Sequence, residues 1–142
     1  MLGNKDNGYA IMKNIIFDVR SIILESRNEA IHSVNFSRVM MYHKIGKLIV
    51  TEFQGNRNRA DYGSKLLKRI SDNIVPEFGS GFSVRILELS RQFYRIFPNT
   101  NTLYSQLNWS QYRLLIRIDN QDRREFYIAE SVKNNWSKRD ER

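Results

Sequence analysis

Residues 9–53 read YAIMKNIIFDVRSIILESRNEAIHSVNFSRVMMYHKIGKLIVTEF, a stretch with no proline and one glycine, Gly46. Apolar side chains recur in it at steps of mostly three and four, which is the spacing of one face of an α-helix. The recurring positions are Met12, Ile16, Val19, Ile23, Ala30, Val34, Met41, Ile45 and Leu48. Two interpretations fit: one long helix, or two helices that meet near residues 32–35, where Ser33 or Asn35 could cap a new start.

The two interpretations differ in what would bury the apolar side chains of this stretch. A single helix would extend ~60 Å at 1.5 Å per residue. Because that is too long for a compact monomer of this size, the helix would pair in an oligomer. Two shorter helices would instead form an ordinary hairpin within the core. We favour long helices, which would help the chain to dimerise through the Met12–Leu48 stripe.

The rest of the chain also predicts helices, separated by short polar or glycine-rich breaks. Residues 54–59 are polar and predict a loop. Helices are expected over residues 61–78, 83–96, 109–118 and 121–134, with a turn at residues 79–81 and Ser83 as an N-cap. Residues 137–140 have the form of a capping box and predict the start of another helix. No segment alternates convincingly with period two.

These elements predict an all-α fold: a helical bundle with long N-terminal helices and a helix-turn-helix-like pair. The 142 residues suffice for one domain with a buried core. We expect residues 1–8 to be a flexible N-terminus and residues 9–136 to be the helical domain. Residues 137–142 would begin a truncated following helix, so the chain is interpreted as one module of a longer protein.

Composition narrows the possible functions. The chain has no cysteine and two histidines, which excludes disulfides, thiol nucleophiles and a histidine-rich metal site. No apolar run has the roughly 20 residues of a membrane span, and the N-terminus has no apolar signal core. A cytoplasmic protein without membrane association is therefore expected. The net charge of +8 favours a polyanionic partner, chiefly nucleic acid, although a basic soluble surface without a dedicated partner has the same composition.

The helices predicted over residues 61–78 and 83–96 form a helix-turn-helix candidate. In such a pair the second helix presents side chains near its N-terminus to the major groove. Arginine can read guanine, glutamine can read adenine, and other cations contact phosphates. The alternative is a packed helical pair with a solvated basic face. The candidate DNA-binding residues are Arg57, Arg59, Lys65, Lys68, Arg69, Ser83, Arg85, Arg91, Gln92 and Arg95.

The C-terminal third is rich in aromatic side chains and arginines. Aromatic residues could stack on bases, as in proteins that bind single strands. Their helical spacing instead predicts core positions for Trp109, Tyr112, Phe126, Tyr127 and Trp136. No carboxylate or histidine pattern predicts a catalytic or metal site, so no catalytic residue, metal ligand or cofactor is expected in this chain.

Several short blocks together resemble a known family. They are Val34-Asn35, residues 42–46 (YHKIG), residues 60–63 (ADYG), residues 78–83 (FGSGFS), residues 91–94 (RQFY), residues 107–112 (LNWSQY), residues 124–127 (REFY) and residues 135–137 (NWS). In this order they resemble the N-terminal domain of the YhcG family, a domain of unknown function that precedes a PD-(D/E)XK nuclease domain. Gln111 stands where the family often has histidine, which argues against proton chemistry there.

The resemblance implies a bacterial, cytoplasmic protein concerned with DNA. Divalent metal is expected only for the nuclease domain, whose motifs this chain lacks, so no catalytic residue is carried over. Our first hypothesis is a non-catalytic DNA-binding or targeting module of a nuclease. The alternative is a protein–protein or homo-oligomerisation module of that nuclease.

Overall fold

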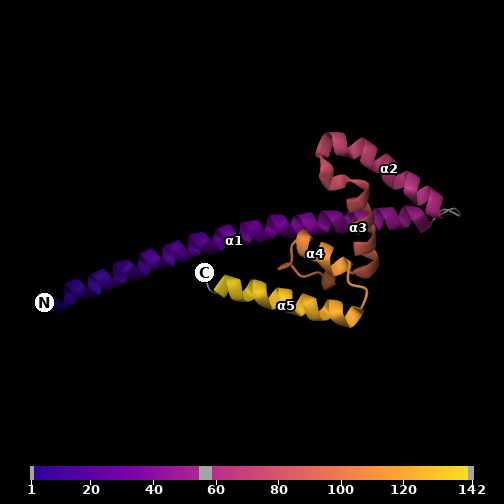
Figure 1. Ribbon diagram of the computed structural model, residues 1–142. Coiled ribbons are helices and arrows are strands. Elements are labelled where there is room, and N and C mark those ends of the chain that lie inside the picture. Colours follow the sequence, from indigo (N-terminus) through magenta and orange to yellow (C-terminus); the bar gives the residue numbers. More distant parts are fainter. Residues whose placement is uncertain (1, 55–58, 141–142) are drawn as a thin grey trace. The chain divides into compact units, whose positions relative to one another are not determined.

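The computed structural model describes the backbone of residues 2–54 and 59–140 and the side chains of residues 12–53 and 62–134. Within those residues every regular element is helical, which confirms the all-α prediction (Figure 1). The α-helices are α1 (Leu2–Gln54), α2 (Arg59–Phe78), α3 (Val84–Ile96), α4 (Trp109–Ile116) and α5 (Gln121–Asp140). Two 3₁₀ turns, η1 (Ser80–Phe82) and η2 (Thr100–Thr102), lie in the connections.

The first helix is continuous, so the interpretation as two helices meeting at residues 32–35 is wrong. No proline interrupts α1, and Ser33 and Asn35 do not act as caps because the backbone on both sides stays helical. Residues 1–8 were predicted to be a flexible N-terminus, whereas residues 2–8 form the first turns of the same helix. Contacts nevertheless divide the chain into an N-terminal unit, Met1–Val34, and a C-terminal unit, Asn35–Arg142.

The apolar stripe predicted along α1 has two different environments. In the C-terminal unit Met41 and Ile45 are partly buried and pack against the core, whereas Leu48 is exposed. In the N-terminal unit the stripe is exposed, with Ile16 and Val34 at 65% and 69%. The part of the stripe that remains available to a partner is therefore mainly residues 12–34.

The core of the C-terminal unit is built on aromatic rings from α1, α3 and α4. Tyr42 stacks on Trp109 with ring centroids 4.3 Å apart, and Phe93 contacts both Trp109 and Tyr112. The prediction that Trp109 and Tyr112 are core residues is confirmed. The same prediction is wrong for Phe126 and Tyr127, which are exposed because α5 packs through Ile128 and Val132 instead. The side chain of Trp136 lies outside the described residues.

A second cluster joins the end of α1 to α2 and α3. Its buried members are Ile49, Phe53, Leu67 and Leu87. Figure 1 shows α3 crossing α1 in this unit, and the crossing is close at Gly46. A Cβ atom built there would lie 1.9 Å from the carbonyl oxygen of Ser90. The glycine thus permits backbone-to-backbone packing of the two helices.

The helix boundaries follow local capping chemistry. Ser83 caps α3, as predicted, and its Oγ accepts a hydrogen bond from the Ile86 amide. Asn108 and Gln111 form a reciprocal capping box at the start of α4. The new helix predicted to start at Ser137 is absent, because α5 runs through this residue to Asp140. No proline or glycine between Gln121 and Asp140 interrupts its backbone hydrogen bonds, so the serine has no free amides to cap.

Candidate nucleic-acid interface

The predicted helix-turn-helix corner connects α2 to α3 through Gly79, η1 and Ser83. Gly79 has φ of +99°, a conformation that favours glycine, and it lets the chain turn after α2. Tyr42 of α1 donates a hydrogen bond from its hydroxyl to the carbonyl oxygen of Gly81 at 2.9 Å. Gly79 and Ser80 are exposed, whereas Gly81 and Phe82 are half-buried. The corner is therefore held to α1 by Tyr42 and is exposed to solvent at Gly79 and Ser80.

One face of α3 carries polar side chains that the core does not use. Arg85, Glu88, Gln92 and Arg95 are exposed and follow one another at steps of three and four, so they share a face. Gln92 also donates a hydrogen bond from its amide to the carbonyl oxygen of Ile116 at 3.4 Å, which links α3 to the end of α4. Guanidinium and amide groups of this kind can read base edges or contact phosphates.

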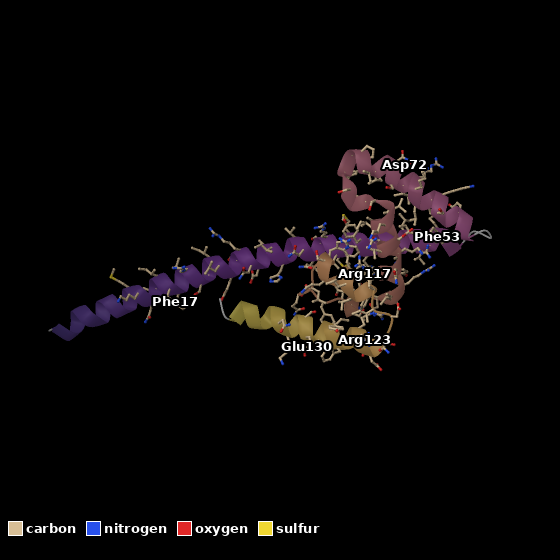
Figure 2. All side chains as sticks on the ribbon, viewed as in Figure 1. Phe17, Phe53, Asp72, Arg117, Arg123 and Glu130 are labelled. Carbon is tan, nitrogen blue, oxygen red and sulfur yellow. The ribbon has the colours of Figure 1, made fainter. Side chains whose placement is uncertain are left out.

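Arg91 is directed elsewhere. It is half-buried, and its guanidinium lies 4.8 Å from the centre of the Phe53 ring, a cation–π distance. Burial lowers the pKa of Arg91, the nearby Arg95 lowers it further, and Glu88 opposes both. Arginine nevertheless stays charged at neutral pH. The structure thus assigns Arg91 first to the packing of α3 on the end of α1, where Figure 2 labels Phe53.

The predicted phosphate contacts on α2 are exposed. Lys65, Lys68 and Arg69 lie on its solvent side, together with Asp72, which Figure 2 labels there. Arg57 falls outside the described residues, and Arg59 begins α2 with a side chain that is not described. Ser83 is half-buried at the N-terminus of α3, where its oxygen serves the helix cap.

The structure adds two cations that the sequence did not single out. Lys44 and Lys47 of α1 are exposed and line a cavity of about 480 Å³ together with Pro98, Asn99 and Thr100. Only folding brings residues 98–100 beside α1, so no sequence signal could have found this pairing. The two lysine side chains give the lining of this cavity a positive charge.

His43 at the edge of that cavity is structural. It is 2% exposed, and its Nε2 lies 2.7 Å from the carbonyl oxygen of Phe97. The rings of Phe93 and Tyr94 flank it edge-on. Because a carbonyl can only accept, Nε2 must carry the hydrogen that it donates. These contacts give His43 a structural role in the core.

An apolar cleft of about 530 Å³ lies among the C-terminal part of α1, α2, η1 and α3. Its wall includes Ile45, Ile70, Ile74 and Phe82, and Glu52 is the charged residue on its lining. Leu48 and Phe78 also line the cleft, and their side chains are 64% and 62% exposed.

The part of the chain that the structure describes contains no cluster of three or more acidic or histidine side chains that could hold a metal ion. Its helices include none with the length and hydropathy needed to cross a membrane.

Comparison with known proteins gives two matches. The family model for the DUF1016 N-terminal domain matches residues 18–141. The protein named "Putative nuclease YhcG" from Escherichia coli (strain K12) is 29% identical over 150 aligned residues, which cover 83% of this chain and 40% of that protein. The chain therefore spans well under half the length of this relative. No solved structure matches the chain.

Proposed function

Because the chain belongs to the DUF1016 N-terminal domain family, we propose that it is a non-catalytic module that attaches a nuclease to duplex DNA in the bacterial cytoplasm. The relative's name includes nuclease, and the match covers 40% of that protein. In this proposal a PD-(D/E)XK domain outside the matched region cleaves the DNA with its divalent metal, and the chain described here contributes binding.

The observation that supports the proposal is the exposed face of α3. Arg85, Gln92 and Arg95 are exposed on that face, where Glu88 also lies, and the Gln92 amide in addition bonds the carbonyl oxygen of Ile116. The corner that precedes α3 is open to solvent at Gly79 and Ser80, so a duplex could approach this corner. Lys65, Lys68 and Arg69 would add phosphate contacts, which position a protein without specifying sequence.

The test is to titrate a fluorescently labelled duplex with the chain at a series of salt concentrations. Fluorescence anisotropy measures the binding constant at each concentration. Each phosphate contact contributes about −0.9 to the slope of log K against log salt. Replacing Arg85 and Arg95 together by alanine should weaken binding and make the slope shallower by about two.

The matched control removes the same charge elsewhere. Arg117 and Arg123 are exposed near α4 and α5, and their joint replacement by alanine also lowers the net charge by two. If the two double variants lose the same affinity, the α3 face has no special role. Binding that is absent, or insensitive to salt, would contradict the proposed DNA attachment altogether.

A second candidate function is assembly of the nuclease through self-association. The observation that favours it is the exposure of large apolar side chains along the N-terminal unit, among them Met12, Ile16, Phe17, Ile22 and Val34, at 58–69%. Contiguous apolar surface of this kind marks association sites in soluble proteins. The two functions are compatible, because many helical DNA-binding domains act as dimers.

A further inference from the structure

The exposed part of α1 contains a seven-residue repeat. Residues 12–18, 19–25 and 26–32 read MKNIIFD, VRSIILE and SRNEAIH. The second position is basic in all three repeats, the third is Asn or Ser, and the seventh is acidic in the first two. A strict seven-residue period on a helix favours a left-handed supercoil with another helix, since 3.5 residues per turn keep one seam facing the partner.

The seam is formed by the first, fourth and fifth positions of the repeat. In the first two repeats these are Met12, Ile15, Ile16, Val19, Ile22 and Ile23. All six side chains are between 46% and 65% exposed. At 100° per residue they share one side of α1. This seam is apolar, continuous over two repeats and uncovered in the N-terminal unit, where Figure 2 shows side chains projecting along α1.

Charges line the two edges of the seam and differ in sign. Lys13, Arg20 and Arg27 occupy the second position and lie on one edge, about 100° from its centre. Asp18 and Glu25 occupy the seventh position and lie at a similar angle on the other edge. All five side chains are exposed. The helix thus has a basic edge and an acidic edge on either side of this seam. A separate apolar row at the sixth position, Phe17, Leu24 and Ile31, lies on the far side of the helix and has no such pair of charged edges.

This arrangement is complementary to itself in one orientation only. When two identical helices pair in parallel about a two-fold axis, the acidic edge of each faces the basic edge of the other. In an antiparallel pair, acidic edges face each other and basic edges do so as well. Charges at the edges of a coiled-coil seam select partner and orientation in this way.

We propose that residues 12–32 form a parallel coiled coil with the same residues of a second copy of this chain. This inference rests on the second candidate function, self-association, and specifies its partner, its surface and its orientation. The third repeat carries Ser26 and Glu29 at seam positions, so the first two repeats supply most of the apolar contact.

Cysteine cross-linking of the full chain tests the orientation, because the chain has no cysteine of its own. In a parallel pair, the cysteine of Met12→Cys lies opposite the same cysteine of the second chain. The same holds for Ser26→Cys. A disulfide needs Cα atoms about 4.4–6.8 Å apart. In an antiparallel pair centred on Val19, identical positions would lie about 20 Å apart, and only a mixture of the two variants would cross-link.

The expected result is rapid disulfide dimerisation of each single variant alone. Asn14→Cys, on the side of α1 away from the seam, is the control for random collision and should cross-link at least tenfold more slowly. Cross-linking restricted to the mixture, or equal rates for all three variants, would overturn the parallel pairing.

Sedimentation of the chain separates failure of the orientation from failure of self-association. A dimer is expected, and Ile15→Ser with Ile22→Ser should weaken association at least tenfold without altering the fluorescence of the buried Trp109. A strict monomer at high concentration would overturn self-association itself and leave the DNA proposal untouched. An oligomer that survives the double substitution would place the interface outside this seam.

Discussion

Replacing Gly46 by alanine would insert a methyl group where α1 crosses α3. The new Cβ would lie 1.9 Å from the carbonyl oxygen of Ser90, 2.7 Å from its carbonyl carbon and 3.2 Å from Cβ of Tyr94. The first two are backbone atoms, so no side-chain rotation can relieve the overlap. Since real Cβ atoms essentially never approach such atoms within 3.0 Å, the helices must separate by about 1 Å.

Two opposing effects set the size of the loss. Alanine favours a helix over glycine by about 1 kcal/mol. Overpacking of a core costs about 1–3 kcal/mol and occasionally more. The rigid backbone and the buried neighbours Ile49 and Phe93 place this case at or above the upper end. We therefore expect the free energy of unfolding to fall by about 2 kcal/mol or more, net of the helix gain.

Urea unfolding followed by circular dichroism and by tryptophan fluorescence measures this change. Trp109 is buried against Tyr42, so its emission reports the C-terminal unit. For a unit of about 100 residues, a loss of 2 kcal/mol corresponds to a fall of about 8 °C or more in Tm.

Ser90→Ala is the matched control at the same crossing. The hydroxyl of Ser90 is buried without a hydrogen-bond partner, so its removal adds no atom and leaves no new unpaired group. Its stability should stay unchanged or rise slightly. If Gly46→Ala is as stable as the original chain, the close crossing of α1 and α3 is wrong.

Two further predictions concern α4. Burial raises the pKa of Tyr112 to about 12 from its ordinary 10.0, so its neutral hydroxyl contributes stability that is complete below pH 10 and is lost as pH rises towards 12. Urea titrations at alkaline pH should show a loss that Tyr112→Phe diminishes and the exposed control Tyr127→Phe does not; equal pH profiles for both variants would contradict the buried hydroxyl. Asn108→Ala removes the side-chain half of the capping box and should lower the free energy of unfolding by about 1 kcal/mol, whereas Ser110→Ala, at an exposed neighbouring position, should change it by less than about 0.5 kcal/mol. Indistinguishable unfolding midpoints for these two variants would show that the cap is not stabilising.

The sequence predicted the elements well where local chemistry decides them. Ser83 was predicted as the cap of α3, and its side-chain oxygen pairs with a free amide three residues away. Asn108 caps α4 by the same chemistry. The same reasoning failed at Ser137, because a capping pattern acts only where the backbone leaves the helix. At residues 32–35 the sequence allowed either one long helix or two helices with a break between them. The structure has one uninterrupted helix there.

The candidate site was predictable in part. Residue type and spacing placed Arg85, Gln92 and Arg95 on one face of α3, and the structure leaves all three exposed. The same pattern could not separate them from Arg91, whose position over Phe53 depends on where the end of α1 lies. The sequence could not identify Lys44 and Lys47 as part of a cavity, because residues 98–100, which are distant in sequence, form the rest of its lining.

By itself the sequence determined the helical class, most helix starts and the seven-residue repeat of α1, because these depend on neighbours within about two turns. Only the tertiary structure decided which apolar side chains are covered. Met41 and Ile16 belong to one stripe, yet Met41 packs on the core and Ile16 is 65% exposed. Burial depends on elements distant in the sequence, so periodicity identifies an apolar face but not what covers it.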